Sequence, residues 1–284
     1  MKKIHHYIVR LVVDVIESRV RSRAARLFCV SYRKASTIFY HNMIDYVRII
    51  KDSLHVRMRG KRKHNMKFAK EQLKLYAITD RSWLAGKTLM EQVEQALKGG
   101  ATMIQLREKH LDEAAFLQEA EAMLELCHRY HVPLIINDRV ELAKKVGADG
   151  VHVGQSDMQL ARAREILGED AIIGVTAKTV AQAKAAEAGG ATYLGSGAVF
   201  GTSTKTDAKA MTLDLFQEIC ESVSIPVVAI GGIHEHNIEE LAGRKMTGFA
   251  IISGIFASDD IEAQTKLLLQ KANQLVTDHN PCNE

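Results

Sequence analysis

Proline and cysteine are scarce in this sequence of 284 residues, which has 3 prolines and 4 cysteines. The cysteines are well separated and form no C-x-x-C pair, which argues against a disulfide framework or a thiolate zinc site. They favour a reducing compartment, and we expect the protein to be cytoplasmic. No run approaches the roughly 18 uncharged apolar residues of a membrane span, so no membrane span is expected. With 46% hydrophobic and 25% charged residues, the composition excludes disorder and predicts a globular chain.

Charge is distributed unevenly along the chain. Residues 1–65 contain 16 Lys and Arg against 4 Asp and Glu, a net charge of +12, and they include no proline and one glycine. Residues 66–284 contain 22 against 30, a net charge of −8. This change divides the chain at Met66 into a basic N-terminal extension and a globular part.

Four interpretations of the basic extension compete. Acidic residues interrupt the apolar core that a secretory signal needs, and they recur too often for a typical transit peptide. A nucleic-acid or membrane-surface arm would follow from the positive charge. We favour an untranslated leader, with Met66 as the true start, because residues 59–63 can be encoded by a purine-rich stretch placed like a bacterial ribosome-binding site. That interpretation assumes a bacterial gene.

From residue 73 onward, short β-rich runs alternate with amphipathic stretches. The expected strands are 73–79, 101–108, 133–138, 150–155, 172–177, 193–199, 226–232 and 248–255. The expected helices include 89–97, 112–131, 158–167, 180–188, 213–223, 237–242 and 261–276, and another is expected to open at residue 139. Eight strand–helix units predict a (β/α)8 TIM barrel. The alternative, a doubly wound open sheet, usually carries a G-x-G-x-x-G loop after its first strand, and this sequence has none.

The second expected strand places two cations at its carboxyl end. Side chains alternate along a strand, so if Ile104 and Leu106 pack on helices, then Gln105, Arg107 and Lys109 point toward the barrel axis. Converging cations indicate an anion site. The alternative interpretation is a partly solvated strand end with incidental ion pairs.

Carboxylates follow the next two strands. Asp138 ends the third and Asp157 follows the fourth, beside the cationic strand, an arrangement that suits Mg²⁺ carrying a diphosphate. Each aspartate can also be read as the N-cap of the helix that follows it. We favour the metal site, because the cations lie next to both aspartates.

The last three strands are followed by phosphate-binding features. Residues 197–205 form a glycine-bearing loop with hydroxyls and a lysine, and they lack the order of a Walker loop. Gly231 and Gly232 end the seventh strand, and Ser253 and Gly254 lie in the run I-I-S-G (251–254) of the eighth, where barrel enzymes commonly hold a phosphate. Simple turn geometry is the alternative explanation of these glycines.

Three other polar residues have structural explanations. His152 inside the fourth strand is read as a hydrogen-bonded core residue. Thr176 and Thr179 can each cap the helix after the fifth strand. No Ser-His-Asp or Cys-His order stands out, so covalent nucleophilic catalysis is not indicated.

These motifs together resemble the thiamine-phosphate synthase family. The matching segments are Q-L-R-E-K (105–109), I-N-D (136–138), G-V-H-V-G-Q (150–155), T-S-T-K (202–205) and A-I-G-G-I (229–233), in the family's order and at similar spacing. The resemblance covers about residues 73–276. It implies that a pyrimidinylmethyl diphosphate and a carboxylated thiazole phosphate are joined to thiamine monophosphate, with release of diphosphate and CO2.

The resemblance also implies roles for particular residues. The pyrimidine diphosphate would be bound by Gln105, Leu106, Arg107, Glu108, Lys109, Asn137, Thr176 and Lys205. Arg107, Lys109, Thr176 and Lys205 of this set would assist catalysis. The thiazole phosphate would be bound by Thr202, Ser203, Thr204, Gly232, Ile252 and Ser253. Asp138 and Asp157 would hold Mg²⁺.

Two rival functions follow from the same residues. A thiazole tautomerase resembles the synthase but needs no diphosphate site, and retention of Asn137, Asp138, Asp157 and Lys205 argues against it. A nucleic-acid-binding protein is disfavoured for the barrel by the acidic balance of residues 66–284, so we expect phosphorylated small molecules as partners. The sequence does not indicate an oligomeric state. Gly197 and Gly201 stand where prolines are common in the family, which predicts a looser phosphate loop.

Overall fold

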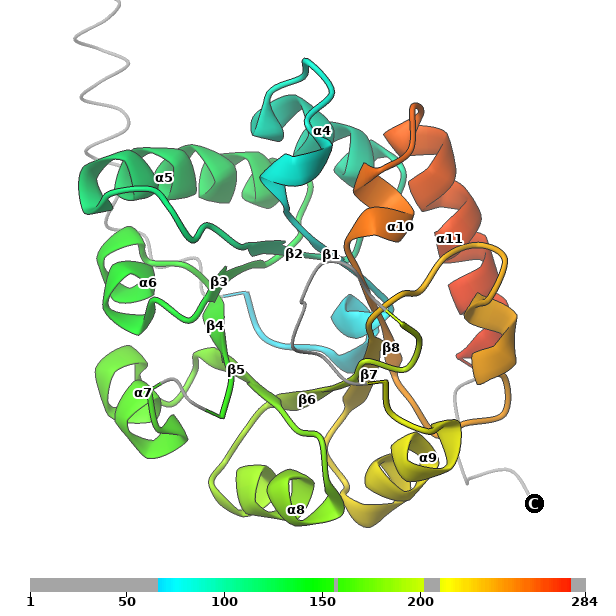
Figure 1. Ribbon diagram of the computed structural model, residues 1–284. Helices are drawn as coiled ribbons and strands as arrows, with labels where there is room; N and C mark the ends of the chain where they lie inside the picture. The colour runs from blue at the N-terminus through cyan, green and yellow to red at the C-terminus, as the bar shows by residue number, and fades with distance from the viewer. Residues whose placement is uncertain (1–65, 156–157, 202–209, 277–284) are drawn as a thin grey trace, which may run out of the picture. The chain divides into compact units, whose positions relative to one another are not determined.

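Eight parallel strands surround the centre of the described part of the chain, with helices outside them (Figure 1). The computed structural model describes residues 66–155, 158–201 and 210–276, which belong to the unit His64–Glu284. The interpretations of residues 1–65 lie outside this part of the chain. The strands are β1 (Leu75–Ile78), β2 (Met103–Leu106), β3 (Leu134–Asn137), β4 (Gly150–Val153), β5 (Ile172–Thr176), β6 (Tyr193–Gly197), β7 (Val227–Ile230) and β8 (Gly248–Ile251).

Each strand pairs in parallel with its two neighbours in the sequence, and β1 pairs with β8 to close the barrel. The predicted (β/α)8 barrel is therefore confirmed. All eight carboxyl ends lie at the same end of a barrel of parallel strands, and we call this end the carboxyl rim. Residues that follow different strands, far apart in the sequence, are thereby gathered at one rim.

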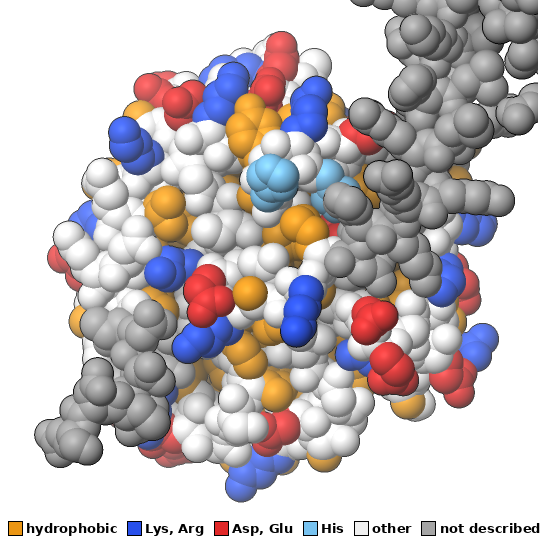
Figure 2. Space-filling view, turned by 180° about the vertical axis from the view of Figure 1, so that it is seen from behind, with side chains coloured by type: hydrophobic (Ala, Val, Ile, Leu, Met, Phe, Trp, Pro, Cys, Tyr) orange, Lys and Arg blue, Asp and Glu red, His pale blue; other side chains and the backbone are white. Residues whose placement is uncertain are grey.

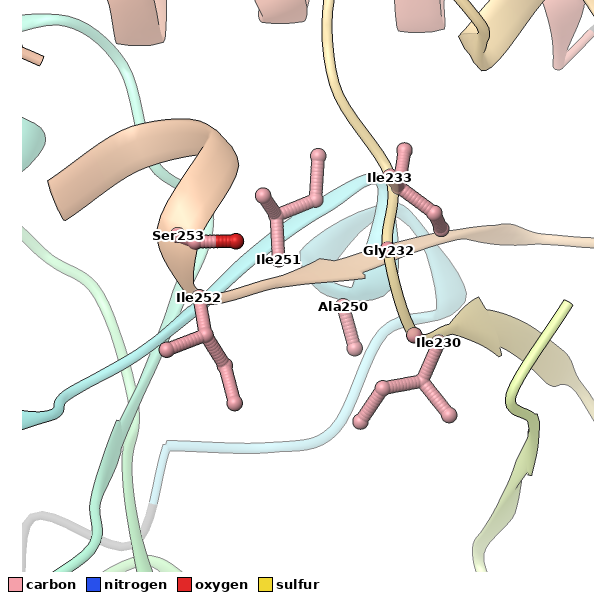
Figure 3. A pocket seen from close by; sticks show the side chains of 8 residues that line it. Ile230, Gly232, Ile233, Ala250, Ile251, Ile252 and Ser253 are labelled. Atoms are coloured by element: carbon pink, nitrogen blue, oxygen red, sulfur yellow. The ribbon is translucent and has the colours of Figure 1, made fainter. Parts of the chain in front are cut away.

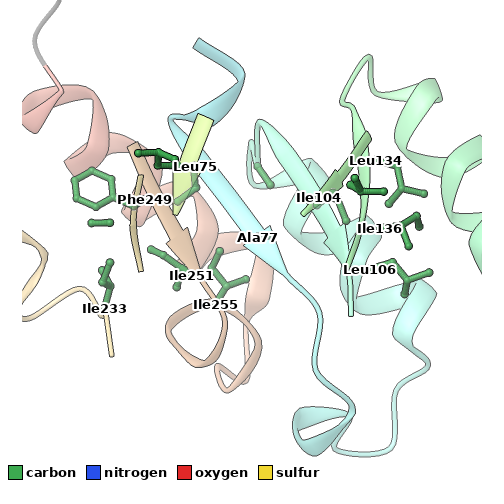
Figure 4. Packing of buried hydrophobic residues seen from close by; sticks show 14 of the residues in the cluster. Leu75, Ala77, Ile104, Leu106, Leu134, Ile136, Ile233, Phe249, Ile251 and Ile255 are labelled. Atoms are coloured by element: carbon green, nitrogen blue, oxygen red, sulfur yellow. The ribbon is translucent and has the colours of Figure 1, made fainter. Parts of the chain in front are cut away.

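Alternation along the strands separates two buried clusters. Ile104 and Leu106 of β2 belong to the outer cluster, which packs against the helices, as the alternation predicted (Figure 4). Met103 belongs to a second, smaller cluster with Tyr76 and Tyr193, among residues that fill the barrel interior. The interior is thus packed with side chains, and the space available to ligands lies at the rim.

Helices and short 3-10 turns connect the strands. The α-helices are α4 (Leu89–Lys98), α5 (Glu113–Arg129), α6 (Val140–Val146), α7 (Leu160–Leu167), α8 (Val180–Ala188), α9 (Leu213–Ser222), α10 (Ser253–Phe256) and α11 (Ile261–Leu275). The 3-10 turns are η2 (Lys70–Leu73), η3 (Arg81–Trp83) and η4 (Ile238–Leu241). Side-chain caps explain several helix starts: Thr88, Asp112, Thr179 and Thr212 each accept a hydrogen bond from a backbone N–H of the first turn.

Several boundary predictions were wrong, as three examples show. The eighth strand was expected to reach residue 255, but it ends at Ile251 and a short helix starts at Ser253. Residues of that helix pack into the outer cluster, so their apolar run did not distinguish helix from strand. The helix expected at 237–242 is the 3-10 turn η4. The helix expected from residue 158 begins at Leu160, with Gln159 at its N-cap.

Charged side chains of both signs are interspersed over the visible part of the described surface (Figure 2). Within the described residues, no helix is long and apolar enough to cross a membrane. Among the described residues, the large hydrophobic side chain that is exposed to solvent is Leu267 on the last helix, α11.

Candidate functional site at the carboxyl rim

Gln105 of β2 lies on the face that the alternation predicted. Gln105 is 2% exposed in the barrel interior, and its Nε2 donates a hydrogen bond to the Tyr76 hydroxyl at 2.5 Å. Arg107 follows the strand, and its guanidinium donates from Nη1 to the Asp80 carboxylate at 2.9 Å. Lys109 is exposed in the loop beyond. The strand thus carries an amide inside the barrel and a cation at the rim.

Arg107 is anchored without using all its donors. Its side chain is 10% exposed, and its Nε is buried with no hydrogen-bond partner among the described residues. A buried donor without a partner costs free energy, so this atom marks a place where an anion can bind. The sequence interpretation of an anion site at this strand end is consistent with that geometry.

Asp80 is a rim residue that the sequence analysis missed. Burial alone would raise the pKa of its carboxyl, but hydrogen bonds from Ser82 and the charge of Arg107 lower the pKa below its usual value. Its Oδ1 accepts from the Ser82 N–H at the start of η3. Asp80 therefore orients Arg107 while it also caps a turn. A carboxylate directly after the first strand was the signal available in the sequence.

Leu106 and Glu108 point away from the barrel axis. Leu106 is fully buried in the outer cluster. The Glu108 carboxylate pairs with Arg81 Nε at 2.7 Å, and Arg81 also pairs with Glu119. Burial raises the pKa of Glu108, against the charge of Arg81. A contact of Leu106 with a substrate would therefore have to come from its backbone, and the Glu108 side chain is engaged in an ion pair.

The carboxylate after β3 does not cap a helix. The N-cap of α6 is Arg139, and it makes no side-chain capping bond, so the capping interpretation of Asp138 was wrong. The Asp138 side chain is exposed and accepts a hydrogen bond from Asn137 Nδ2 at 2.6 Å. Its backbone has φ of 60°, a conformation that aspartate tolerates better than most residues. Asp157, the other predicted metal ligand, lies outside the described residues.

The donor set fits Mg²⁺ as far as the described residues extend. Mg²⁺ is usually bound by one or two carboxylates together with substrate phosphate oxygens, and Asp138 offers one exposed carboxylate beside the anion site. Among the described residues no three His, Cys, Asp or Glu side chains cluster as a ready-made metal site. A metal at this rim would accordingly depend on the oxygens of a bound phosphorylated ligand.

A hydrogen-bonded series of side chains crosses the barrel interior. Tyr76 and Tyr193 hydroxyls are 2.9 Å apart, and the Tyr193 hydroxyl is 3.1 Å from His152 Nδ1. His152 Nε2 lies 3.0 Å from Thr176 Oγ1, at the end of β5. The interpretation of His152 as a hydrogen-bonded core residue is confirmed. The two tyrosines were missed, because a tyrosine in a strand reads simply as an apolar β-former.

Thr176 and Thr179 have separate roles. Thr179 is the N-cap of α8 and accepts from the Gln182 N–H, as one alternative predicted. Thr176 does not cap that helix, and its hydroxyl is half-buried beside His152. Thr176 is the last residue of β5, so its hydroxyl lies where it can contact a ligand at the carboxyl rim.

A small pocket lies between the ends of β7 and β8. Its lining residues are Ile230, Gly231, Gly232, Ile233, Ala250, Ile251, Ile252 and Ser253. The Ser253 hydroxyl is turned toward the loop that carries Gly232 (Figure 3). Gly232 has φ of 66°, and a Cβ there would lie 2.3 Å from the Gly201 carbonyl oxygen. The pocket therefore requires glycine at this position, and it contains three residues predicted to bind a phosphate. The predicted partners Thr202, Ser203, Thr204 and Lys205 lie outside the described residues.

His234 was missed next to this pocket. Its Nε2 lies 3.3 Å from Ser253 Oγ, and its ring stacks on His236 with centroids 5.4 Å apart. Burial lowers the pKa of His234, and the neighbouring His236 lowers it further, while Glu235 opposes both. The available signal was a histidine that follows the glycine pair with only Ile233 between them.

Gly197 lies at the end of β6, in close contact with β7. It is paired with Ile230 of β7, and a Cβ at Gly197 would lie 1.9 Å from the Ile230 carbonyl oxygen. The position therefore has no room for a side chain in this structure. The expectation of a looser loop stays a prediction, because residues 202–209 of that loop lie outside the described residues. A Cβ at Gly201 would meet nothing within 4 Å, so that position does have space for a side chain.

Comparison with known proteins agrees with this geometry. The model of the family described as thiamine monophosphate synthase matches residues 75–255. A thiamine-phosphate synthase of Clostridium acetobutylicum is 46% identical over 195 residues, covering 69% of this chain and 92% of the relative. Thiamine-phosphate synthase 2 of Streptococcus pneumoniae is 40% identical over 208 residues, covering 73% of this chain and 99% of the relative.

A solved structure gives the same result. Thiamine phosphate pyrophosphorylase from Pyrococcus furiosus aligns with a TM-score of 0.68 at 38% identity, covering 73% of this chain and 99% of that one. The matches extend over the barrel and nearly the full length of these relatives. The chain is thus a transferase of thiamine biosynthesis, and it belongs to the thiamine monophosphate synthase family.

Proposed function

We propose that the protein joins 4-amino-2-methyl-5-pyrimidinylmethyl diphosphate to a carboxylated thiazole phosphate, forming thiamine monophosphate, diphosphate and CO2. The observation that carries this proposal is the anchored Arg107, whose buried Nε has no partner among the described residues. Arg107 follows β2, and Asp138 follows β3, which is the strand paired with β2. A cation and a carboxylate at adjacent strand ends suit a magnesium diphosphate.

The chemistry needs no nucleophile from the protein. The bond from the methylene carbon to the diphosphate oxygen breaks, and its electron pair leaves with diphosphate. The electron-rich aminopyrimidine stabilises the resulting cation until the thiazole nitrogen bonds to that carbon. Loss of CO2 from the coupled product leaves an electron pair on its thiazole carbon, and uptake of a proton there gives thiamine monophosphate.

The contribution of the chain is to bind both reactants and to stabilise the departing charge. Arg107, Lys109 and Lys205 would hold the diphosphate, and Thr176 would donate a hydrogen bond to it. Asp138 and Asp157 would hold Mg²⁺, which when bound offsets negative charge on the leaving group. Gly232, Ile252 and Ser253 would hold the thiazole phosphate on the other side of the rim, so that its nitrogen faces the methylene carbon.

An assay of diphosphate release tests this function. The purified full chain, Mg²⁺ and both phosphorylated substrates should give diphosphate and thiamine monophosphate in equal amounts, and EDTA in excess should stop the reaction. Absence of turnover above the blank would refute the proposal. Unchanged turnover in EDTA would refute the metal role alone. The tautomerase alternative is not favoured by the relatives, and it predicts isomerised thiazole without diphosphate release.

A further inference from the structure

Five side chains from five strands form one continuous hydrogen-bonded series inside the barrel. Gln105 of β2 is linked to Tyr76 of β1, which is linked to Tyr193 of β6. Tyr193 is linked to His152 of β4, and His152 is linked to Thr176 of β5. Gln105, Tyr76 and Tyr193 are at most 2% exposed. The series therefore runs from a buried amide to a hydroxyl at the carboxyl rim.

Strand glycines leave the space that this series occupies. A Cβ on Gly174 of β5 would lie 2.4 Å from the Tyr193 hydroxyl and 2.5 Å from His152 Nδ1. A Cβ on Gly195 of β6 would lie 3.0 Å from His152 Cε1. Any side chain at Gly174 would push Tyr193 away from His152. Glycine at these two positions thus leaves room for the contact between the His152 imidazole and the Tyr193 phenol.

One order of proton donation runs through the whole series. The Gln105 amide nitrogen can only donate, so the Tyr76 oxygen accepts from it. Either tyrosine hydroxyl can donate to the other, and in this order Tyr76 gives its proton to Tyr193. Tyr193 then gives its proton to Nδ1 of His152, which leaves the imidazole proton on Nε2 to be donated to Thr176. Burial raises the pKa of both tyrosines well above the usual value, so both phenols keep the protons that the series requires.

We propose that Tyr76, Tyr193 and His152 are positioning residues that fix the Thr176 hydroxyl as a hydrogen-bond donor toward the rim. Because Thr176 Oγ1 accepts from His152, its own proton must go to another acceptor. The acceptor at the rim is an oxygen of the departing diphosphate, so the inference rests on the proposed function in naming the ligand. The direction of the series is a property of the protein alone and can be tested without substrate.

A double-mutant cycle on the full chain tests the coupling. Tyr193→Phe removes one oxygen and keeps the ring, and we expect kcat to fall about tenfold, with the KM for the thiazole phosphate unchanged. Thr176→Val should lower kcat at least as much. Tyr193→Phe should then have no further effect in the Thr176→Val protein, since the hydroxyl that it positions is gone. If kcat of the double variant falls by the product of the two single-variant factors, the proposal is overturned.

Two further variants keep the cycle interpretable. Tyr76→Phe interrupts the series at another point and should lower kcat in the same way, so it replaces Tyr193→Phe if that variant fails to fold. Tyr130→Phe is the matched control, because Tyr130 donates to Glu94 outside the barrel interior. It should leave kcat unchanged. Wild-type kcat in both Tyr76→Phe and Tyr193→Phe would also overturn the proposal.

Nitrogen-15 NMR of the histidines, without substrate, tests the direction. His152 should be the tautomer protonated at Nε2, with its signals assigned by their loss in His152→Gln. In Tyr193→Phe the preference for that tautomer should weaken, because Nδ1 loses its donor. A wild-type His152 protonated at Nδ1 would overturn the proposal even in an active enzyme. An inactive wild-type enzyme with the expected tautomer would refute the proposed function and leave the directed series intact.

Discussion

Charged side chains at the rim are held by other side chains of the barrel. Arg107 is held by Asp80 and the Asp138 carboxylate by Asn137, each through a hydrogen bond shorter than 3 Å. Holding a charge in place before the ligand arrives reduces the reorganisation required in the transition state. Loss of a single rim carboxylate, or of the side chain that holds it, should therefore have a measurable effect on kcat.

Asp138→Ala should lower kcat by tens-fold or more, since a contact that stabilises developing charge contributes about 2–4 kcal/mol in the transition state. Steady-state assays of diphosphate release measure the change. Lys205→Ala, at a position outside the described residues, should have a similar effect. Asp170→Asn, at an exposed turn residue, is the control and should keep wild-type activity. Wild-type rates in Asp138→Ala would remove Asp138 from the site.

Asp80 should make stability depend on acidic pH. Its pKa is lowered in the folded state, so the folded chain binds fewer protons than the unfolded chain below the ordinary aspartate pKa. Its contribution is therefore complete above pH ~4 and is lost as the pH falls through the lowered value. Urea unfolding between pH 2.5 and 6 should show a shallower acid loss in Asp80→Asn than in wild type. An identical pH slope, with Asp170→Asn as reference, would contradict this.

Helix starts in this chain are encoded locally. Thr88 accepts from the Glu91 N–H at 3.2 Å, while the Glu91 carboxylate accepts from the Thr88 N–H at 2.7 Å, a capping box at the start of α4. Similar caps begin α5, α8 and α9. Such ends fix where each helix begins after its strand, and so they set the length of each rim loop.

Thr88→Ala should lower the free energy of unfolding by about 1 kcal/mol, because it removes the oxygen that accepts from the first turn of α4. Urea denaturation followed by circular dichroism measures the loss. Thr88→Ser keeps the hydroxyl and should lose much less. Equal stability of the alanine and serine variants would show that the cap contributes nothing.

Closure of the barrel links the stability of all eight strands. The first and last strands pair directly, and the outer cluster includes residues of every strand. Removal of a large side chain from this cluster should therefore destabilise the whole molecule and not one element. Phe249 of β8 is fully buried there, among the residues seen in Figure 4.

Phe249→Ala should lower the free energy of unfolding by about 3–5 kcal/mol, the usual cost of deleting a buried aromatic ring. The transition should remain a single step, because the barrel shares one packed outer layer. Leu267→Ala removes a side chain that is 39% exposed on α11 and should change stability by less than about 0.5 kcal/mol. Comparable losses in the two variants would contradict the assignment of the core.

Much of the fold was predictable because its signals are local. Alternation along β2 predicted correctly that Gln105 faces the interior and Ile104 the helices. Short runs were less informative: Ile255 and Phe256 would be buried in a strand or in a helix, and the sequence prediction chose the strand wrongly. The expected cytoplasmic location and the magnesium ion stay predictions.

The sequence by itself determined eight strand–helix units, the rim at which the polar residues gather, and the family. Tertiary structure alone decided which side chains meet across the interior, as with Tyr76 and Tyr193, which lie 117 residues apart. It also decided that Asp80 holds Arg107, and that Glu108 turns away to Arg81. The physical reason is that periodicity assigns a residue to a face, whereas its partner on that face depends on how the strands close around the barrel.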